Sequence, residues 1–304
     1  MLIYNMMISL SRFIPLLIFP PKVFWDLLFI FSTHNFIYSM KNSPFNLKDE
    51  IKNLLGIIKT LDKKVVYIFI AVAFFQTFSF YVTSRKFFRV NFFQYFSGND
   101  QVYLIEYLYW FIGDFISYFI FPLLIIKLIF KERIKDYGIS FGDYKTGIKI
   151  TLIFLVIMLP LIWIVSSLPE FNKTYPHLSS AKDSWKIFLA FEAGMFIYMF
   201  SWEFIWRGFM LFGLKEKFGY YAVLIQMLPF LILHNGKPAP ETFGAIIAGV
   251  ALGILALRTN SIFYCVLTHM SVMFSIDLIS VLRYKTDDYG IGINSFLNIL
   301  NAII

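Results

Sequence analysis

Long apolar runs constrain this sequence more than any other feature. A helix needs about 20 apolar residues to cross the hydrocarbon core of a bilayer, and tilt or local thinning absorbs shorter or longer runs. No run alternates polar and apolar residues with a period of two, as a membrane barrel would require. The sequence therefore predicts an all-α, polytopic transmembrane helical bundle with seven spans, or eight if residues 14–40 also cross. The seven runs are 65–84, 103–130, 150–168, 185–213, 219–235, 243–258 and 261–282.

The composition supports a membrane protein over a soluble one. Hydrophobic residues make up 59% of the chain and charged residues only 15%, whereas about 25% is typical of soluble domains. The net charge of +8 would suggest nucleic acid in a soluble protein, but here lysines and arginines in the loops set the topology. We expect a multi-pass protein of a bacterial inner membrane, in contact with the lipid bilayer and without a nucleic-acid partner.

Residues 1–64 form the predicted N-terminal segment, and residues 65–304 form the membrane domain. The apolar run 13–19 ends at Pro20-Pro21-Lys22 without a cleavage site, so we expect residues 14–40 to be a bent first span or a membrane-surface segment, not a cleaved signal. The cationic stretch 41–64 fits either a surface helix or a solvated connection.

Loop charges predict the orientation of the bundle. The alternate connections 41–64, 131–149, 214–218 and 258–260 carry 14 lysines and arginines, and the opposite set carries 9. The positive-inside rule places the first set in the cytoplasm.

Ionisable residues inside the apolar runs are the candidates for chemistry, because a charge at that depth costs from about 3 kcal/mol upward. Glu203 and Arg207 are four residues apart, which places both on one helix face and lets the arginine neutralise the glutamate. The candidates are Glu106, Asp114, Glu192, Glu203, Arg207, His234, His269 and Asp277.

A rise of 1.5 Å per residue gives approximate depths for three of these side chains. Measured from the predicted inner face, Glu203 lies roughly 15 Å deep, His269 roughly 12 Å and His234 roughly 22 Å. Three separate helices would therefore bring one carboxylate and two imidazoles towards a common mid-membrane cavity. A glutamate beside a histidine in such a cavity suits general-base activation of a water, and a second imidazole can donate to an oxyanion.

Other interpretations of these residues remain open. The Glu203–Arg207 pair would also fit a role in helix packing, and His234 would fit a helix cap before the turn at 235–238. Two histidines and a glutamate can bind zinc, although the HExxH spacing is absent. Ser271 is two residues from His269 and faces another side of the helix, which disfavours a serine mechanism.

The remaining polar groups fit structural roles. Cys265 is expected to be a buried spectator thiol. Helix-to-helix hydrogen bonding is the default interpretation for the four other acids, which are Glu106, Asp114, Glu192 and Asp277. Glu192 lies on nearly the same helix face as Glu203, so it would also fit a cavity-lining position.

The order of three short motifs resembles the CPBP family of CAAX proteases and bacteriocin-processing (Abi-type) intramembrane endopeptidases. The family pattern Glu-Glu-x-x-x-Arg corresponds to Trp202-Glu203 followed by Arg207, and Phe-x-x-x-His corresponds to Phe230 and His234. A third motif, which begins with a histidine, corresponds to His269. The resemblance covers about residues 185–282.

The resemblance implies an intramembrane endopeptidase that cuts membrane-associated protein or peptide substrates and needs no cofactor. In that mechanism Glu203 and His234 hold the water, Arg207 orients Glu203, and His269 stands at the oxyanion. Two positions depart from the family pattern: Trp202 replaces the first glutamate, and Met273 replaces an Asn or Asp. The alternatives are a catalytically inactive scaffold or immunity protein and, with no inverted repeat in its support, a transporter.

Overall fold

The computed structural model describes residues 46–301, which belong to two units, Met1–Leu61 and Asp62–Ile304. The predicted span at 14–40 lies outside the described residues. The described part of the first unit is the helix α3 (Leu47–Thr60), which begins where the side chain of Asn46 accepts a hydrogen bond from the backbone N–H of Lys48 (3.1 Å). None of its residues is buried, although its leucines and isoleucines recur at helical spacing along one face.

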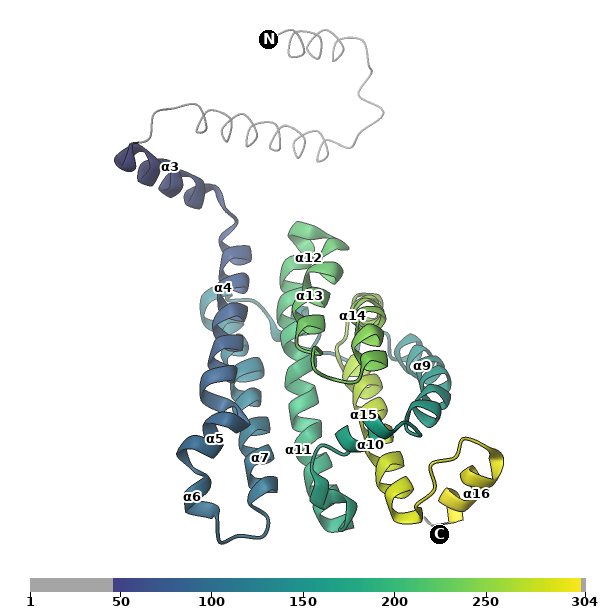
Figure 1. Cartoon of the computed structure of the whole chain (residues 1–304). Helices are drawn as coiled ribbons and strands as arrows, with labels where there is room; N and C mark the ends of the chain where they lie inside the picture. Colours follow the sequence, from purple (N-terminus) through teal and green to yellow (C-terminus); the bar gives the residue numbers. More distant parts are fainter. Residues whose placement is uncertain (1–45, 302–304) are drawn as a thin grey trace. The chain divides into compact units, whose positions relative to one another are not determined.

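All regular secondary structure in the described part of the second unit is helical, which confirms the predicted all-α class for residues 62–301. Stretches of wider, π-helical turns interrupt several long helices, and short, tighter helices lie in two connections; all of these are named η. Figure 1 labels the main α helices. The elements are α4 (Lys63–Phe78), η1 (Ser79–Thr83), α5 (Arg85–Asn91), α6 (Phe93–Phe96), α7 (Val102–Phe115), η2 (Ile116–Ile120), α8 (Phe121–Leu124), η3 (Ile125–Phe130), η4 (Ile134–Tyr137), α9 (Tyr144–Val165), α10 (Pro169–Thr174), η5 (Ser179–Lys182), α11 (Trp185–Glu203), η6 (Phe204–Phe212), α12 (Gly213–Phe218), α13 (Tyr221–Ile232), α14 (Ala239–Thr259), α15 (Phe263–Thr286) and α16 (Ile293–Asn301).

Six helical stretches in the described residues are long and apolar enough to cross a membrane, and they make the chain a multi-pass membrane protein. Each corresponds to one of the seven predicted runs, and its ends differ from the predicted ones by at most seven residues. The six stretches are Lys63–Asn91, Val102–Phe130, Tyr144–Val165, Trp185–Phe218, Ala239–Thr259 and Phe263–Thr286.

The predicted span at 219–235 is the exception. Its helix, α13, has only 12 residues and is roughly 18 Å long, short of a hydrocarbon core of about 30 Å. The chain turns after Leu233, and Gly236 adopts a positive φ of 95° there. The described residues therefore support six spans and a short apolar helix, not seven or eight spans.

Polar side chains just before the apolar runs start several of the spans. The Asp62 side chain accepts a hydrogen bond from the backbone N–H of Val65 (3.2 Å), and Ser184 does the same for Ile187 (3.4 Å). Such caps satisfy backbone donors that the first helical turn leaves free. The starts of α4 and α11 are therefore fixed by local sequence.

The helix α11 and its continuation η6 form the central span. Of the apolar window in Trp185–Phe218, 61% is buried, compared with 11% in the peripheral α9. The helix α11 packs on α7 and on α15, and η6 packs on α13 (Figure 1). Residues on this span are therefore shielded from lipid by neighbouring helices.

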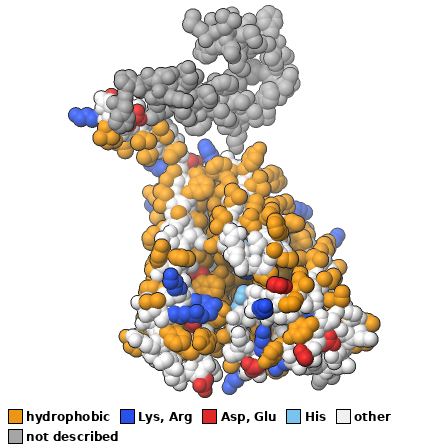
Figure 2. All heavy atoms as spheres, viewed as in Figure 1, with side chains coloured by type: hydrophobic (Ala, Val, Ile, Leu, Met, Phe, Trp, Pro, Cys, Tyr) orange, Lys and Arg blue, Asp and Glu red, His pale blue; other side chains and the backbone are white. Residues whose placement is uncertain are grey.

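Hydrophobic side chains cover most of the visible face over the helices (Figure 2). On α9, Leu152, Val156 and Ile157 expose between 55% and 73% of their surface. Soluble monomeric proteins rarely expose so large an apolar surface. This surface suits contact with lipid chains.

A substitution at Gly194 should test how tightly α11 packs on α7. A side-chain carbon added there would lie 2.6 Å from Leu108 and 2.9 Å from the ring of Phe111. We expect Gly194→Leu to lower the free energy of unfolding in detergent by about 1–3 kcal/mol because the core would be overpacked.

Gly244→Leu is the matched control, because an added carbon there meets nothing within 4 Å. It should leave the unfolding free energy unchanged or slightly raised, since leucine favours a helix more than glycine does. Equal losses in both variants would contradict the packing described here.

Candidate functional site

The central span positions two of the four predicted site residues. Glu203 is the last residue of α11, and Arg207 lies in η6, where the helix widens to π-helical turns. Both side chains are completely buried. Single π-helical insertions of this kind are frequent at functional sites because they re-aim side chains within a helix.

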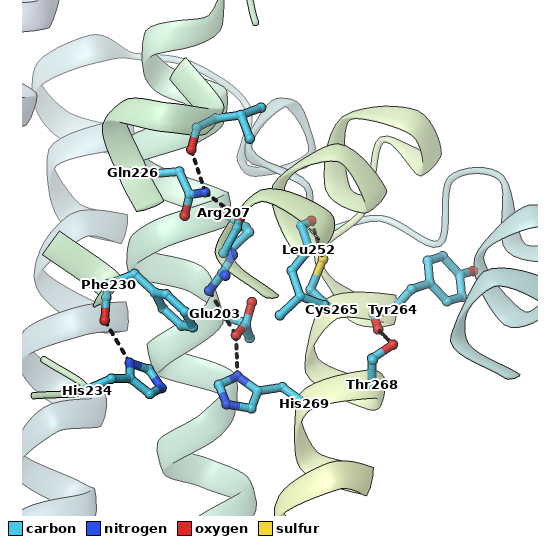
Figure 3. A network of polar contacts seen from close by, with 12 residues as sticks. Glu203, Arg207, Gln226, Phe230, His234, Leu252, Tyr264, Cys265, Thr268 and His269 are labelled. Carbon is cyan, nitrogen blue, oxygen red and sulfur yellow. Dashed lines mark hydrogen bonds and ion pairs between the residues drawn. The ribbon is translucent and has the colours of Figure 1, made fainter. Parts of the chain in front are cut away.

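One carboxylate oxygen links two spans. Glu203 Oε1 accepts a hydrogen bond from Arg207 Nη1 at 3.0 Å and lies 2.6 Å from Nδ1 of His269, which is on α15 (Figure 3). Because a carboxylate only accepts, the proton in the second contact belongs to the imidazole nitrogen. The negative charge of Glu203 is therefore shared between a guanidinium and an imidazole.

The ring of Phe230 on α13 lies among the charged groups. The Arg207 guanidinium carbon is 4.2 Å from the ring centroid, and the rings of His234 and His269 lie 4.5 and 6.1 Å from it. A cation over an aromatic face is stabilised by the ring quadrupole. Sequence reasoning did not select Phe230 as a site residue, although its position four residues before His234 placed it on the same helix face.

His234 follows α13 and is held by the backbone. Its Nδ1 lies 2.7 Å from the carbonyl oxygen of Phe230, and its own carbonyl accepts a hydrogen bond from the hydroxyl of Thr242 (3.0 Å). The carbonyl partner places the proton on Nδ1, so Nε2 has a free lone pair. The structure thus fixes the orientation of the second imidazole.

The structure brings together all four predicted residues from three segments of the chain. Several of their polar atoms have no hydrogen-bond partner among the described residues, namely Glu203 Oε2 and the Nε and Nη2 atoms of Arg207. Buried atoms without partners are costly in a folded protein. The cluster therefore combines a fixed negative charge, two anchored imidazoles and unused hydrogen-bonding capacity.

Trp202 stands where the sequence pattern departs from a paired glutamate. Its ring lies 6.1 Å from the ring of His234 in an edge-to-face contact, and 6.0 Å from that of Phe230. The indole N–H is buried without a partner among residues 46–301. Met273, the second departure, is also buried, so both replacements add apolar volume.

The other intramembrane polar groups lie elsewhere. Glu106 forms ion pairs with Arg85 (2.5 Å) and Arg89 (2.9 Å). Asp114 accepts hydrogen bonds from Ser79, Thr83 and Trp110 at 2.6 to 2.8 Å. Both acids thereby connect neighbouring helical segments, as their default interpretation expects.

Cys265 and Ser271 make no hydrogen bond to the four predicted site residues in the described part of the chain. Cys265 is buried, and its thiol lies 3.2 Å from the carbonyl oxygen of Leu252. No hydrogen bond joins the hydroxyl of Ser271 to a histidine in the described residues, and its backbone carbonyl accepts a hydrogen bond from the hydroxyl of Ser275 (2.7 Å). In the described part of the chain, no three His, Cys, Asp or Glu residues are grouped to hold a metal ion.

A comparison with protein families matches residues 182–275 to the model described as type II CAAX prenyl endopeptidase Rce1-like. The match contains Glu203, Arg207, His234 and His269 and covers most of the predicted region 185–282. It confirms the resemblance to the CPBP family. Comparisons with curated proteins and with solved structures give no match.

Removing the arginine should show how strongly the buried pair depends on its partner. Arg207→Met leaves the Glu203 charge without its guanidinium, and we expect a loss of about 3–5 kcal/mol in the free energy of unfolding. Unfolding in detergent, followed by circular dichroism, measures this loss.

Arg258→Met is the matched control because Arg258 forms an exposed ion pair with Asp143. Loss of an exposed pair should change stability by at most about 1 kcal/mol. If Arg207→Met proves as mild as this control, the buried pair does not depend on the guanidinium.

Proposed function

We propose that this chain, which carries an Rce1-like domain of the CPBP family over residues 182–275, is an intramembrane endopeptidase. Its substrates would be membrane-associated proteins or peptides, whose peptide bonds are hydrolysed at the site of Glu203, His234 and His269. The observation that carries the proposal is the contact between Glu203 and His269 (2.6 Å), with a second anchored imidazole close by.

His234 is the proposed general base. Its Nδ1 proton is held by the carbonyl of Phe230, which leaves the Nε2 lone pair to accept a proton from water. The water oxygen then attacks the carbonyl carbon of the scissile bond. His234 returns the proton to the leaving nitrogen when the carbon–nitrogen bond breaks, so the step needs no cofactor.

His269 is the proposed oxyanion donor. Glu203 fixes a proton on Nδ1 and balances the positive charge that the imidazole carries when it also donates from Nε2. Its side chain is 13% exposed, whereas Glu203 is completely buried. The negative charge of Glu203 therefore acts on the reaction through His269. A hydrogen bond from a preorganised donor such as His269 is stronger in a low-dielectric site.

Arg207 is the proposed positioning residue. Its contact with Oε1 (3.0 Å) pairs the Glu203 carboxylate with a positive charge, and the ring of Phe230 packs against the guanidinium (4.2 Å). Arg207 thus balances the charge of Glu203, and that charge in turn supports His269. Arg207 itself does not contact the substrate in this proposal.

One observation favours an inactive binding protein as the second candidate. Trp202 places an indole against His234 at the position where the family pattern has a glutamate. A binding protein would use the same cavity without hydrolysis. Cleavage by the purified protein separates the two candidates.

The decisive experiment compares the wild type with Glu203→Gln, His234→Ala and His269→Ala on a quenched library of lipid-anchored peptides. We expect the wild type to cleave and each variant to lose at least about a hundredfold in rate, because each change removes a charge or a donor that acts in the transition state.

His177→Ala is the control histidine variant, since its ring packs on Tyr175 (4.7 Å), outside the cluster. It should cleave like the wild type. Full activity in Glu203→Gln and His234→Ala would reject the mechanism. Binding of substrates without cleavage by any folded form, including the wild type, would establish the inactive binder.

A further inference from the structure

Two acids that the proposed mechanism does not use lie on the same pair of helices as the site. Glu192 is on α11, eleven residues before Glu203, and Asp277 is on α15, eight residues after His269. The helices α11 and α15 pack against each other. The two acids therefore lie on a second part of this helix pair, separate from the contact between Glu203 and His269.

Neither acid has a hydrogen-bond donor. Glu192 is 5% exposed and Asp277 is completely buried, and none of their four carboxyl oxygens has a partner in the part of the chain that the structure describes. The two acids on α7 do have partners, because Glu106 forms ion pairs with two arginines and Asp114 accepts hydrogen bonds from three donors. Burial of an ionised carboxylate without a hydrogen-bond donor costs free energy, so we expect a bound cation or a proton to satisfy this pair.

The two carboxyl groups act on each other. They lie close enough for a hydrogen bond between their side chains once one of them carries a proton. Two ionised carboxylates at such proximity repel strongly in a low-dielectric interior. One proton turns the pair into a donor and an acceptor, which removes one charge and satisfies both groups.

We infer that Glu192 and Asp277 share a single proton and form an acid–base site distinct from the Glu203 site. Carboxyl pairs that share a proton are known as acid–base centres in other proteins. Here the shared proton would also join α11 to α15, the helices that carry Glu203 and His269.

Nearby charged and titratable groups are already engaged with other partners. Lys237 forms an ion pair with Glu241 (2.6 Å), which also accepts from the hydroxyl of Tyr175. The hydroxyl of Tyr107 donates to the carbonyl of His177 (2.8 Å). The groups outside the pair whose charges act on Asp277 are Tyr107, Tyr175, Lys237 and Glu241, and none of them donates to the pair.

A proton fits the pair better than a metal ion. Magnesium and calcium take six or more oxygen ligands, whereas this site offers two side chains. In the described residues no third acid, histidine or cysteine joins them to form a metal-binding group. The pair therefore suits a proton better than magnesium or calcium.

Infrared spectroscopy tests the inference directly, because a protonated carboxyl has its own C=O band that shifts in heavy water. The experiment compares the wild type near neutral pH with the double variant Glu192→Gln/Asp277→Asn, which keeps the shape of both side chains. We expect the difference spectrum to contain the band of one protonated carboxyl per chain. If the double variant does not fold, each single variant is compared in the same way.

Glu106→Gln is the control, because Glu106 forms ion pairs with Arg85 and Arg89, and its replacement should not change this band. A difference spectrum without the band, or with two protonated carboxyls, overturns the shared proton. Absence of the band together with a melting temperature that magnesium or calcium raises only in the wild type would assign a metal site instead. None of these readings depends on proteolytic activity.

Discussion

The charge of Glu203 is the constraint on which the rest of the site depends. A carboxylate that is completely buried in a membrane protein must have charged or donating partners. Its oxygen Oε1 binds the guanidinium of its own helix and the imidazole of α15, so this single atom fixes the relative position of two spans. Phe230 then packs on the guanidinium and brings α13, with His234 at its end, to the same place.

Much of this arrangement follows from the sequence. The apolar runs predicted the helices, because backbone groups in lipid must be satisfied within each segment. The constant rise of a helix placed Glu203 and His269 at a similar depth, and the structure brings them into contact. Depth says nothing about the rotation of a helix around its axis. For that reason the position of Phe230 and the meeting of Glu192 with Asp277 were not predicted.

The two departures from the family pattern change the polarity of the site in the same direction. Trp202 and Met273 replace polar residues with apolar ones, and both are buried. The described site therefore retains one carboxylate, which contacts the imidazole of His269, whereas the imidazole of His234 packs on Phe230. In the proposed mechanism this carboxylate serves His269, and the proton transfers fall to His234. An enzyme with this site would rely on imidazole chemistry more than on carboxylate chemistry.

The shortness of α13 has a consequence for solvation. The chain at 233–238 is non-helical and follows a helix of roughly 18 Å, so a bilayer core of about 30 Å would enclose this turn. Irregular backbone persists at that depth only when protein covers it or water reaches it. Asn235 and Gly236 are exposed, so protein does not cover them. Water that enters the bilayer as far as this turn would lie next to His234, the proposed general base.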